Sequence, residues 1–139
     1  MFFVFCFLFL VEALHYFHQY YVHMPIEYAS AWQYGYKEVV ERVMRERERY
    51  QKVLVTTAYD QPYIYVLWYG NYDPKQWVNN GEFNKQFDRF VFQKIERTDI
   101  GRLHNALLIG HPQELGGESS LWTVNFPDET TAFTAIERQ

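Results

Sequence analysis

The sequence predicts a small α/β domain that follows a strongly hydrophobic N-terminal helix. Three observations carry this prediction: an apolar run at residues 1–14, an amphipathic helical pattern at residues 36–50, and short apolar stretches at residues 52–57 and 106–110. Short β-branched or aliphatic runs are typical of strands buried in a parallel sheet. The chain has 139 residues, of which 48% are hydrophobic, so one domain with a buried core is expected.

The N-terminal run reads MFFVFCFLFLVEAL and is interrupted only by Glu12. It is shorter than the roughly 20 residues that a full membrane span needs. A signal peptide is disfavoured because the run has no basic start and no small-residue cleavage site after it. A buried core helix is disfavoured because the run has no polar face to turn towards solvent. We therefore expect residues 1–17 to be the last part of a transmembrane helix that begins before this sequence.

Residues 18–34 are expected to form an aromatic link at the membrane surface, because Tyr and Trp are enriched where helices leave a bilayer. The chain has no Lys or Arg before Lys37. Cytoplasmic flanks of membrane helices are usually rich in these two residues. The sequence therefore predicts that the α/β domain, residues 35–139, lies on the extracytoplasmic side of the cell membrane.

The first element of the domain is predicted to be a surface helix. Pro25 is expected to end the interfacial segment, and Ser30 or Gln33 to cap the turn that follows it. Over residues 36–50 apolar side chains recur at helical spacing, and charges of alternating sign fill the other face. The predicted buried face consists of Tyr36, Val39, Val40, Val43 and Met44.

A strand at residues 52–57 is predicted next, followed by a turn and a second helix. Asp60 is suited to cap this helix, and Pro62 is suited to its first turn. The helix would cover residues 63–69 and end at Gly70. By composition alone the same stretch also fits a strand, so the helix prediction depends on Asp60 and Pro62.

The remaining elements are short. In order they are a helix at residues 75–79 ending at Asn80-Gly81, strands at residues 90–95 and 106–110, a helical turn at residues 111–115, and a hairpin of residues 122–126 and 131–137. Together the elements predict a small, three-layer-like α/β domain with a mixed, partly parallel sheet and a C-terminal β-hairpin.

Composition and motifs argue against several function classes. The net charge of -4 disfavours a nucleic-acid partner, which needs a basic surface. Cys6 is the only cysteine, so neither an internal disulfide nor a cysteine metal site is possible. His15, His18 and His23 lack the i, i+4 spacing of a helical ligand pair. The sequence has no glycine-rich phosphate loop, and it pairs no nucleophile with a base. We expect no cofactor, no metal and no catalytic residue in this chain.

One cluster carries a binding hypothesis. Tyr59, Asp60, Gln61 and Tyr63 follow the carboxyl end of the predicted strand at residues 52–57, where open α/β sheets place their ligand crevices. Aromatic faces together with carboxylate and amide groups suit a sugar. The alternative is structural: Asp60 caps the helix, whose core-facing side consists of Tyr63, Val66, Leu67 and Trp68.

Three segments resemble a known family. They are YGYKE at residues 34–38, QPYI at residues 61–64 and YDP at residues 72–74, which follow the apolar helix and the Tyr-rich link. In this order they resemble the C-terminal soluble region of bacterial membrane glycosyltransferases of the protein O-mannosyltransferase and aminoarabinose-transferase type. The resemblance covers the chain from about Phe9 onward.

The resemblance implies a function and also what this chain lacks. Members of that family transfer a sugar from a polyprenyl-phosphate carrier to an acceptor on the outer side of the membrane. Their catalytic base is an acidic residue in the first extracytoplasmic loop, and no residue here corresponds to it. The chain would therefore work with an N-terminal membrane part of the same protein, the bilayer, and a glycan or lipid-linked sugar. Its own role would be non-catalytic, such as acceptor binding.

Two other interpretations stay open at this point. One is a membrane-anchored binding or interaction module on the extracytoplasmic side, with no enzyme attached. The other is a soluble flavodoxin-like enzyme domain whose N-terminal run is not native.

Overall fold

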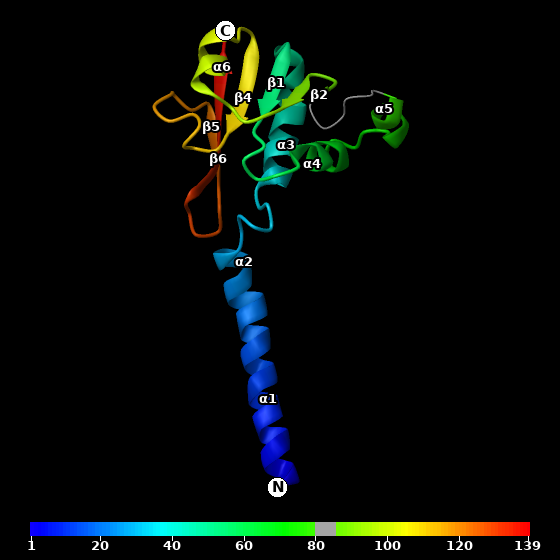
Figure 1. Ribbon diagram of the computed structural model, residues 1–139, viewed down its shortest axis with the longest axis vertical. Helices are drawn as coiled ribbons and strands as arrows, with labels where there is room; N and C mark the ends of the chain where they lie inside the picture. The colour runs from blue at the N-terminus through cyan, green and yellow to red at the C-terminus, as the bar shows by residue number, and fades with distance from the viewer. Residues whose placement is uncertain (80–85) are drawn as a thin grey trace.

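A computed structural model describes residues 1–79 and 86–139 (Figure 1). It shows a long N-terminal helix that projects from an α/β domain, so the predicted fold class is confirmed. The division of the chain at residues 17 and 34 stays a prediction.

The N-terminal helix is longer than the apolar run suggests. It consists of α1 (Phe2–His18), a π-helical turn (Gln19–His23) and α2 (Met24–Glu27), in direct succession. By length and composition this 26-residue helix can cross a membrane, and none of its most apolar window is buried in the rest of the chain. Pro25 does not end the helix as expected, because it occupies the first turn of α2, where a missing N–H is tolerated.

The link to the domain is fixed by backbone conformation. Neither Ser30 nor Gln33 caps the next helix, contrary to expectation, since Gln33 has φ 55° and the N-cap is Gly35 with φ 95°. A Cβ atom on Gly35 would lie 3.1 Å from Val124 and 3.2 Å from Phe133. The chain thus passes tightly over the end of the sheet before the first domain helix begins.

The predicted surface helix is confirmed as α3 (Tyr36–Glu46), which continues as a 3₁₀ turn (Arg47–Arg49). Its buried residues are Tyr36, Val39, Val40 and Val43. This is the face that the helical spacing predicts, because side chains three and four residues apart lie on one side of a helix.

The described strands form one six-stranded mixed sheet in the order β2-β3-β1-β4-β6-β5. The strands are β1 (Lys52–Val55), β2 (Gln86–Phe87), β3 (Phe90–Phe92), β4 (Ala106–Gly110), β5 (Trp122–Asn125) and β6 (Thr131–Arg138). β1 lies between β3 and β4 and is parallel to both. β5 and β6 are antiparallel and form the predicted C-terminal hairpin.

Helices cover both faces of the sheet. Val53 and Val55 of β1 belong to the core beneath α3 and α4 (Pro62–Tyr69), whereas Leu54 belongs to the core beneath α6 (Arg97–Arg102). Burial on both faces explains why β1 and β4 are apolar at nearly every position. The three-layer arrangement is therefore confirmed.

The second helix differs from prediction at its start. Pro62 begins α4 as expected, but Asp60 does not cap it, because Asp60 adopts φ 69° and Gln61 is the N-cap residue. The helix ends before Gly70 as predicted. Trp68 is 78% exposed, although its place in the helix suggested a core position.

Two shorter helices complete the domain. α5 (Pro74–Asn79) is the predicted short helix, and Oδ1 of Asp73 accepts a hydrogen bond from the Lys75 N–H at 2.9 Å. Its expected end at Asn80-Gly81 lies outside the described residues. The sequence did not predict α6, which has six residues, no apolar repeat and a capping box formed by Glu96 and Asp99.

The parallel strands have a common direction relative to the N-terminal helix. In Figure 1 the carboxyl ends of β1 and β4 point towards the side from which α1 and α2 project. The C-terminus and the amino ends of these strands lie at the opposite end of the domain. Any crevice at the carboxyl edge of the sheet therefore faces the N-terminal helix.

Candidate functional site

The sheet has a switch point at its carboxyl edge. From β1 the chain runs through α4 and α5 to β3, and from β3 it runs through α6 to β4 on the other side of β1. The two connections lie on opposite faces of the sheet. Open α/β sheets bind ligands where connections diverge in this way, because the strand ends are left uncovered there.

A cavity of about 650 Å³ lies at this point, and we call it the crevice. Its residues follow the carboxyl ends of all three parallel strands. They are Ala58 and Tyr59 after β1, Lys94, Ile95, Glu96 and Arg97 after β3, and His111, Gln113 and Glu114 after β4. Residues more than 50 positions apart in the sequence are brought together only by the parallel pairing of the strands.

Tyr59 forms the aromatic wall of the crevice. Its hydroxyl donates a hydrogen bond to the Ala132 carbonyl at 2.9 Å, and its ring packs edge-on against Phe133 at 5.0 Å. The His111 ring lies 5.6 Å from it on the crevice side. Burial raises the pKa of the Tyr59 hydroxyl, and the nearby Glu114 carboxylate adds to this. The hydroxyl is therefore held neutral, and the ring rather than the hydroxyl is available to a ligand.

The Glu114 side chain links the segments that follow β3 and β4. Its Oε1 accepts a hydrogen bond from the Ile95 N–H at 3.3 Å, and its Oε2 accepts one from the His111 N–H at 2.9 Å. His111 in turn accepts a hydrogen bond at Nδ1 from the Gln113 N–H at 3.2 Å. With Nδ1 as acceptor, the ring proton lies on Nε2, so His111 offers a donor there.

Two cations complete the crevice. Lys94 and Arg97 are both exposed, and neither forms an ion pair or a side-chain hydrogen bond with any residue in the described ranges. The carboxylate of Glu96 accepts a hydrogen bond in the capping box of α6. The two positive charges are therefore available to a bound group.

The structure divides the predicted site between two hollows. Tyr59 lines the crevice, but Tyr63 lines a different, aromatic cavity of about 570 Å³. Asp60 and Gln61 are exposed between them, and the Tyr63 hydroxyl donates a hydrogen bond to Oε1 of Gln61 at 2.8 Å. The ring of Tyr63 stacks on Trp77 with centroids 5.4 Å apart. The four residues thus form a strip that connects two hollows, not one pocket.

Among the described residues, those that line the aromatic cavity include no charged side chain. It is lined by Tyr63, Ile64, Tyr65, Leu67, Trp68, Tyr69, Tyr72, Pro74 and Trp77. Aromatic faces of this kind suit apolar ring and chain surfaces, including the C–H faces of sugars.

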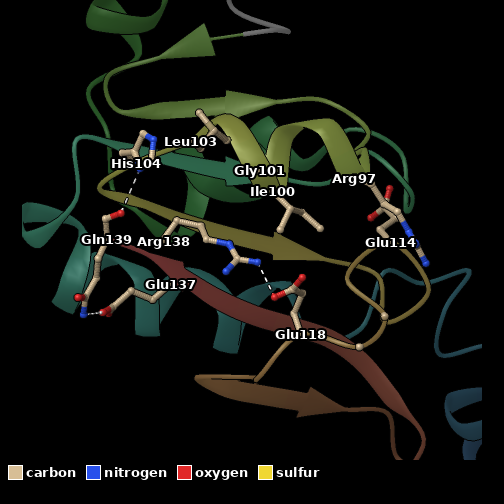
Figure 2. A pocket seen from close by; sticks show the side chains of 12 residues that line it. Arg97, Ile100, Gly101, Leu103, His104, Glu114, Glu118, Glu137, Arg138 and Gln139 are labelled. Carbon is tan, nitrogen blue, oxygen red and sulfur yellow. Dashed lines mark hydrogen bonds and ion pairs between the residues drawn. The ribbon is translucent and has the colours of Figure 1, made fainter.

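A further hollow of about 630 Å³ lies on the α6 face of the sheet, and Figure 2 shows it from close by. It shares Arg97 and Glu114 with the crevice. Its other charged groups are largely paired: Arg138 forms an ion pair with Glu118 at 2.5 Å, and Nδ1 of His104 lies 3.2 Å from the main-chain oxygen of Gln139. The crevice end is the part of this surface with unpaired cations.

Sequence reasoning missed Lys94, Arg97, His111 and Glu114. A signal for two of them was present, because His111 and Glu114 follow directly after the fully apolar run at residues 106–110. The rule that placed a crevice after residues 52–57 applies equally to that strand. Among the described residues, no group of three His, Cys, Asp or Glu side chains lies close enough to hold a metal ion.

Comparisons of the chain with protein-family models, with curated proteins and with solved structures find no match.

Proposed function

We propose that this chain is the membrane-anchored, extracytoplasmic domain of a membrane glycosyltransferase that uses a polyprenyl-phosphate sugar. In this proposal the domain is non-catalytic and helps to bind the acceptor or the sugar carrier. The observation that carries the proposal is the direction of the sheet, since the carboxyl ends of β1 and β4 point towards the N-terminal helix (Figure 1). The crevice is lined by residues that follow these strand ends.

The N-terminal helix supports the anchoring part of the proposal. It is 26 residues long and apolar enough to cross a membrane by length and composition. Its exit carries stacked aromatic pairs, such as Tyr16 with Tyr20 and Phe17 with Tyr21, both with ring centroids 6.1 Å apart. Aromatic side chains are favoured at the level of lipid headgroups.

Contacts between the link and the domain support a fixed orientation. Oε1 of Gln33 accepts a hydrogen bond from the Tyr65 hydroxyl of α4, and the ring of Tyr34 lies 6.5 Å from that of Phe126 beside the β5–β6 turn. Ala29 is buried. Because the link is attached at the carboxyl edge of the sheet, the crevice is kept on the side of the helix and of the bilayer that the helix would cross.

The family resemblance supports the choice of enzyme. The segment QPYI spans Gln61 and Tyr63, which lie between the crevice and the aromatic cavity. A strip of exposed polar groups beside stacked aromatic rings is suited to hold a sugar ring, since each ring face can pack on C–H groups while the amide and carboxylate bind hydroxyls.

Cysteine labelling tests the location. Cys6 is the only cysteine, so a Cys6→Ser background with Ser119→Cys places one thiol in the exposed loop before β5. We expect a membrane-impermeant maleimide to label this thiol on intact cells. Labelling only after the cells are permeabilised would place the domain inside and contradict the proposal.

A binding titration tests the role of the strip. The full chain in lipid nanodiscs is titrated with polyprenyl-phosphate sugar and with acceptor glycan, and tryptophan fluorescence is followed. We expect Tyr63→Ala to weaken binding about fivefold through loss of ring contact. Tyr63→Phe, which keeps the ring, is the matched control and should bind nearly as the native chain does. Unchanged binding in Tyr63→Ala and Asp60→Ala would reduce both residues to structural roles.

The genome supplies a test that separates the proposal from a free-standing anchored module. We expect the reading frame to continue upstream of the Met1 codon through several hydrophobic spans and a loop with acidic residues. A ribosome-binding site directly before that codon would favour a membrane-anchored binding module without transferase activity.

A further inference from the structure

We propose that the crevice is a binding site for a phosphate monoester, with the phosphate between Lys94, Arg97 and Nε2 of His111 and the rest of the ligand against the Tyr59 ring. This inference does not depend on the glycosyltransferase proposal, because it uses only the residues that line the crevice.

The cations are the first reason. Lys94 and Arg97 lie three residues apart at the exit of β3 and both line the crevice. Within residues 1–79 and 86–139 neither has an ion-pair partner, whereas Arg42, Arg47, Arg89 and Arg138, none of which lines the crevice, each pair with a carboxylate. A guanidinium and an ammonium that converge on one hollow suit a dianion better than a single carboxylate.

The carboxylates of the crevice do not cancel this charge by direct contact. Both oxygens of Glu114 accept backbone N–H groups, from Ile95 and from His111. The Glu96 side chain accepts a backbone N–H at the start of α6. Both carboxylates thus accept hydrogen bonds from backbone N–H groups. Within the described residues neither forms an ion pair with Lys94 or Arg97, so these two cations can contact an external anion.

His111 adds a hydrogen-bond donor to the same wall. Its Nδ1 accepts the Gln113 N–H at 3.2 Å, which orients the ring and leaves the proton on Nε2. The ring lies 5.6 Å from that of Tyr59 at an interplanar angle of 55°. An anion held by the cations can therefore receive a further hydrogen bond while its organic part packs on an aromatic face.

The size of the crevice indicates more than an inorganic ion. A cavity of about 650 Å³ falls in the range of sites for small organic ligands. Arg97 and Glu114 also line the hollow on the α6 face, and Figure 2 shows both residues at one end of that hollow. A phosphate ester with a remainder the size of a sugar ring would occupy the crevice.

Titration of the full chain in nanodiscs tests this site. Isothermal calorimetry with glucose 6-phosphate, inorganic phosphate and glucose compares the ester, the anion and the neutral ring. We expect glucose 6-phosphate to bind more tightly than inorganic phosphate, and glucose not to bind in the same range. Lys94→Ala and Arg97→Ala should each weaken binding of glucose 6-phosphate about tenfold, as expected for loss of one charge-assisted hydrogen bond.

Two control variants each remove one Lys or Arg side chain outside the crevice. Lys52 lies at the opposite end of β1, Arg45 is exposed on α3, and neither residue lines the crevice. Lys52→Ala and Arg45→Ala should change the affinity less than twofold. Equal weakening in these controls, or equal binding of glucose and glucose 6-phosphate, would mean that no phosphate site exists in the crevice.

Changing the lipid of the nanodiscs distinguishes a lipid headgroup from a soluble phosphate ester as the ligand. Phosphatidic acid carries a phosphate monoester in its headgroup, and phosphatidylcholine does not. If the crevice takes a lipid headgroup, nanodiscs with phosphatidic acid should weaken the apparent affinity for glucose 6-phosphate, and Lys94→Ala should abolish this competition. If the affinity is the same in both lipids, the site takes a soluble phosphate ester. Failure of all phosphate probes would overturn this inference and leave the membrane topology experiment unaffected.

Discussion

Glu114 and Ile95 are joined across the crevice, because Oε1 of Glu114 accepts a hydrogen bond from the Ile95 backbone N–H at 3.3 Å. The same carboxylate accepts the His111 N–H at 2.9 Å through Oε2. One side chain thus satisfies backbone donors at the exits of β3 and of β4. Buried or half-buried N–H groups are costly when they lose their acceptors.

Replacing Glu114 should therefore destabilise the domain. We expect Glu114→Ala to lower the free energy of unfolding by about 2 kcal/mol, since two hydrogen bonds to a charged acceptor are lost. Glu114→Gln keeps one carbonyl acceptor and should cost about half as much. Urea unfolding followed by circular dichroism measures both. Glu46→Ala on α3 is the control, and an equal loss there would contradict the role of Glu114.

Tyr36 carries a hydroxyl that has no hydrogen-bond partner within the described residues, although the residue is 1% exposed. Its ring is stacked on Tyr65 with centroids 4.6 Å apart. Removing an unsatisfied buried hydroxyl while keeping the ring should stabilise the fold, so we expect Tyr36→Phe to raise the free energy of unfolding by about 1 kcal/mol.

Tyr50 is the control for Tyr36, because it is also buried but its hydroxyl has a hydrogen-bond partner. Its hydroxyl donates a hydrogen bond to Oε2 of Glu137 at 2.7 Å, so Tyr50→Phe should destabilise the domain by about 1 kcal/mol. Thermal unfolding of both variants decides the comparison. The same sign of change in both would contradict the hydrogen-bond assignment.

Alkaline pH should weaken the fold through its buried tyrosines. Burial, and then the hydrogen bond to Glu137, raises the pKa of Tyr50 from 10.0 to about 12. Burial is also the main cause of the raised pKa values of Tyr36 and Tyr72, and at Tyr72 a hydrogen bond to Asp88 adds to it. Above pH 10 the unfolded chain releases these protons while the folded domain keeps them, so stability is full below pH 10 and falls as the pH rises to about 12.

Absorbance at alkaline pH measures this behaviour. Tyr36, Tyr50 and Tyr72, whose pKa values are raised, should release their protons in a late phase that coincides with unfolding. In Tyr50→Phe the late phase should lose amplitude. A single phase near pH 10 would show that the buried hydroxyls are accessible.

Gly35 is expected to tolerate no side chain. It adopts φ 95°, and an added Cβ would lie 3.1 Å from Val124. Gly35→Ala should therefore cost about 2 kcal/mol, from the left-handed backbone and from crowding. Gly101→Ala is the control, because it lies within α6 and its Cβ would meet nothing within 4 Å. Alanine there should stabilise the helix by up to about 1 kcal/mol. Denaturant midpoints compare the two.

The N-terminal helix should hold the chain in the membrane. Introducing Leu10→Arg together with Leu14→Arg puts two charges in the middle of the helix, each opposing insertion by about 3 kcal/mol. We expect the variant to leave the carbonate-washed membrane fraction. Val78→Arg, which changes an exposed apolar residue of the domain, should stay in that fraction. Retention of the doubly charged variant would contradict anchoring by this helix.

Elements whose signal is local could be predicted from the amino-acid sequence. The helical spacing of Tyr36, Val39, Val40 and Val43 defined α3, and the apolar run at residues 106–110 defined β4 as a strand buried on both faces. These patterns are visible because burial repeats with the period of the element. The position of Pro62 at the start of α4 is likewise a local effect of its fixed φ.

The short helix α6, the conformation of Asp60 and the crevice depend instead on tertiary contacts. α6 has six residues and no apolar repeat, so its place over Leu54 depends on the sheet beneath it. Asp60 is no helix cap, because the turn after β1 requires φ 69° at that residue. The crevice joins Tyr59, Lys94 and His111 from three separate stretches of chain. Parallel pairing sets such distances, and no local pattern encodes which strands become neighbours.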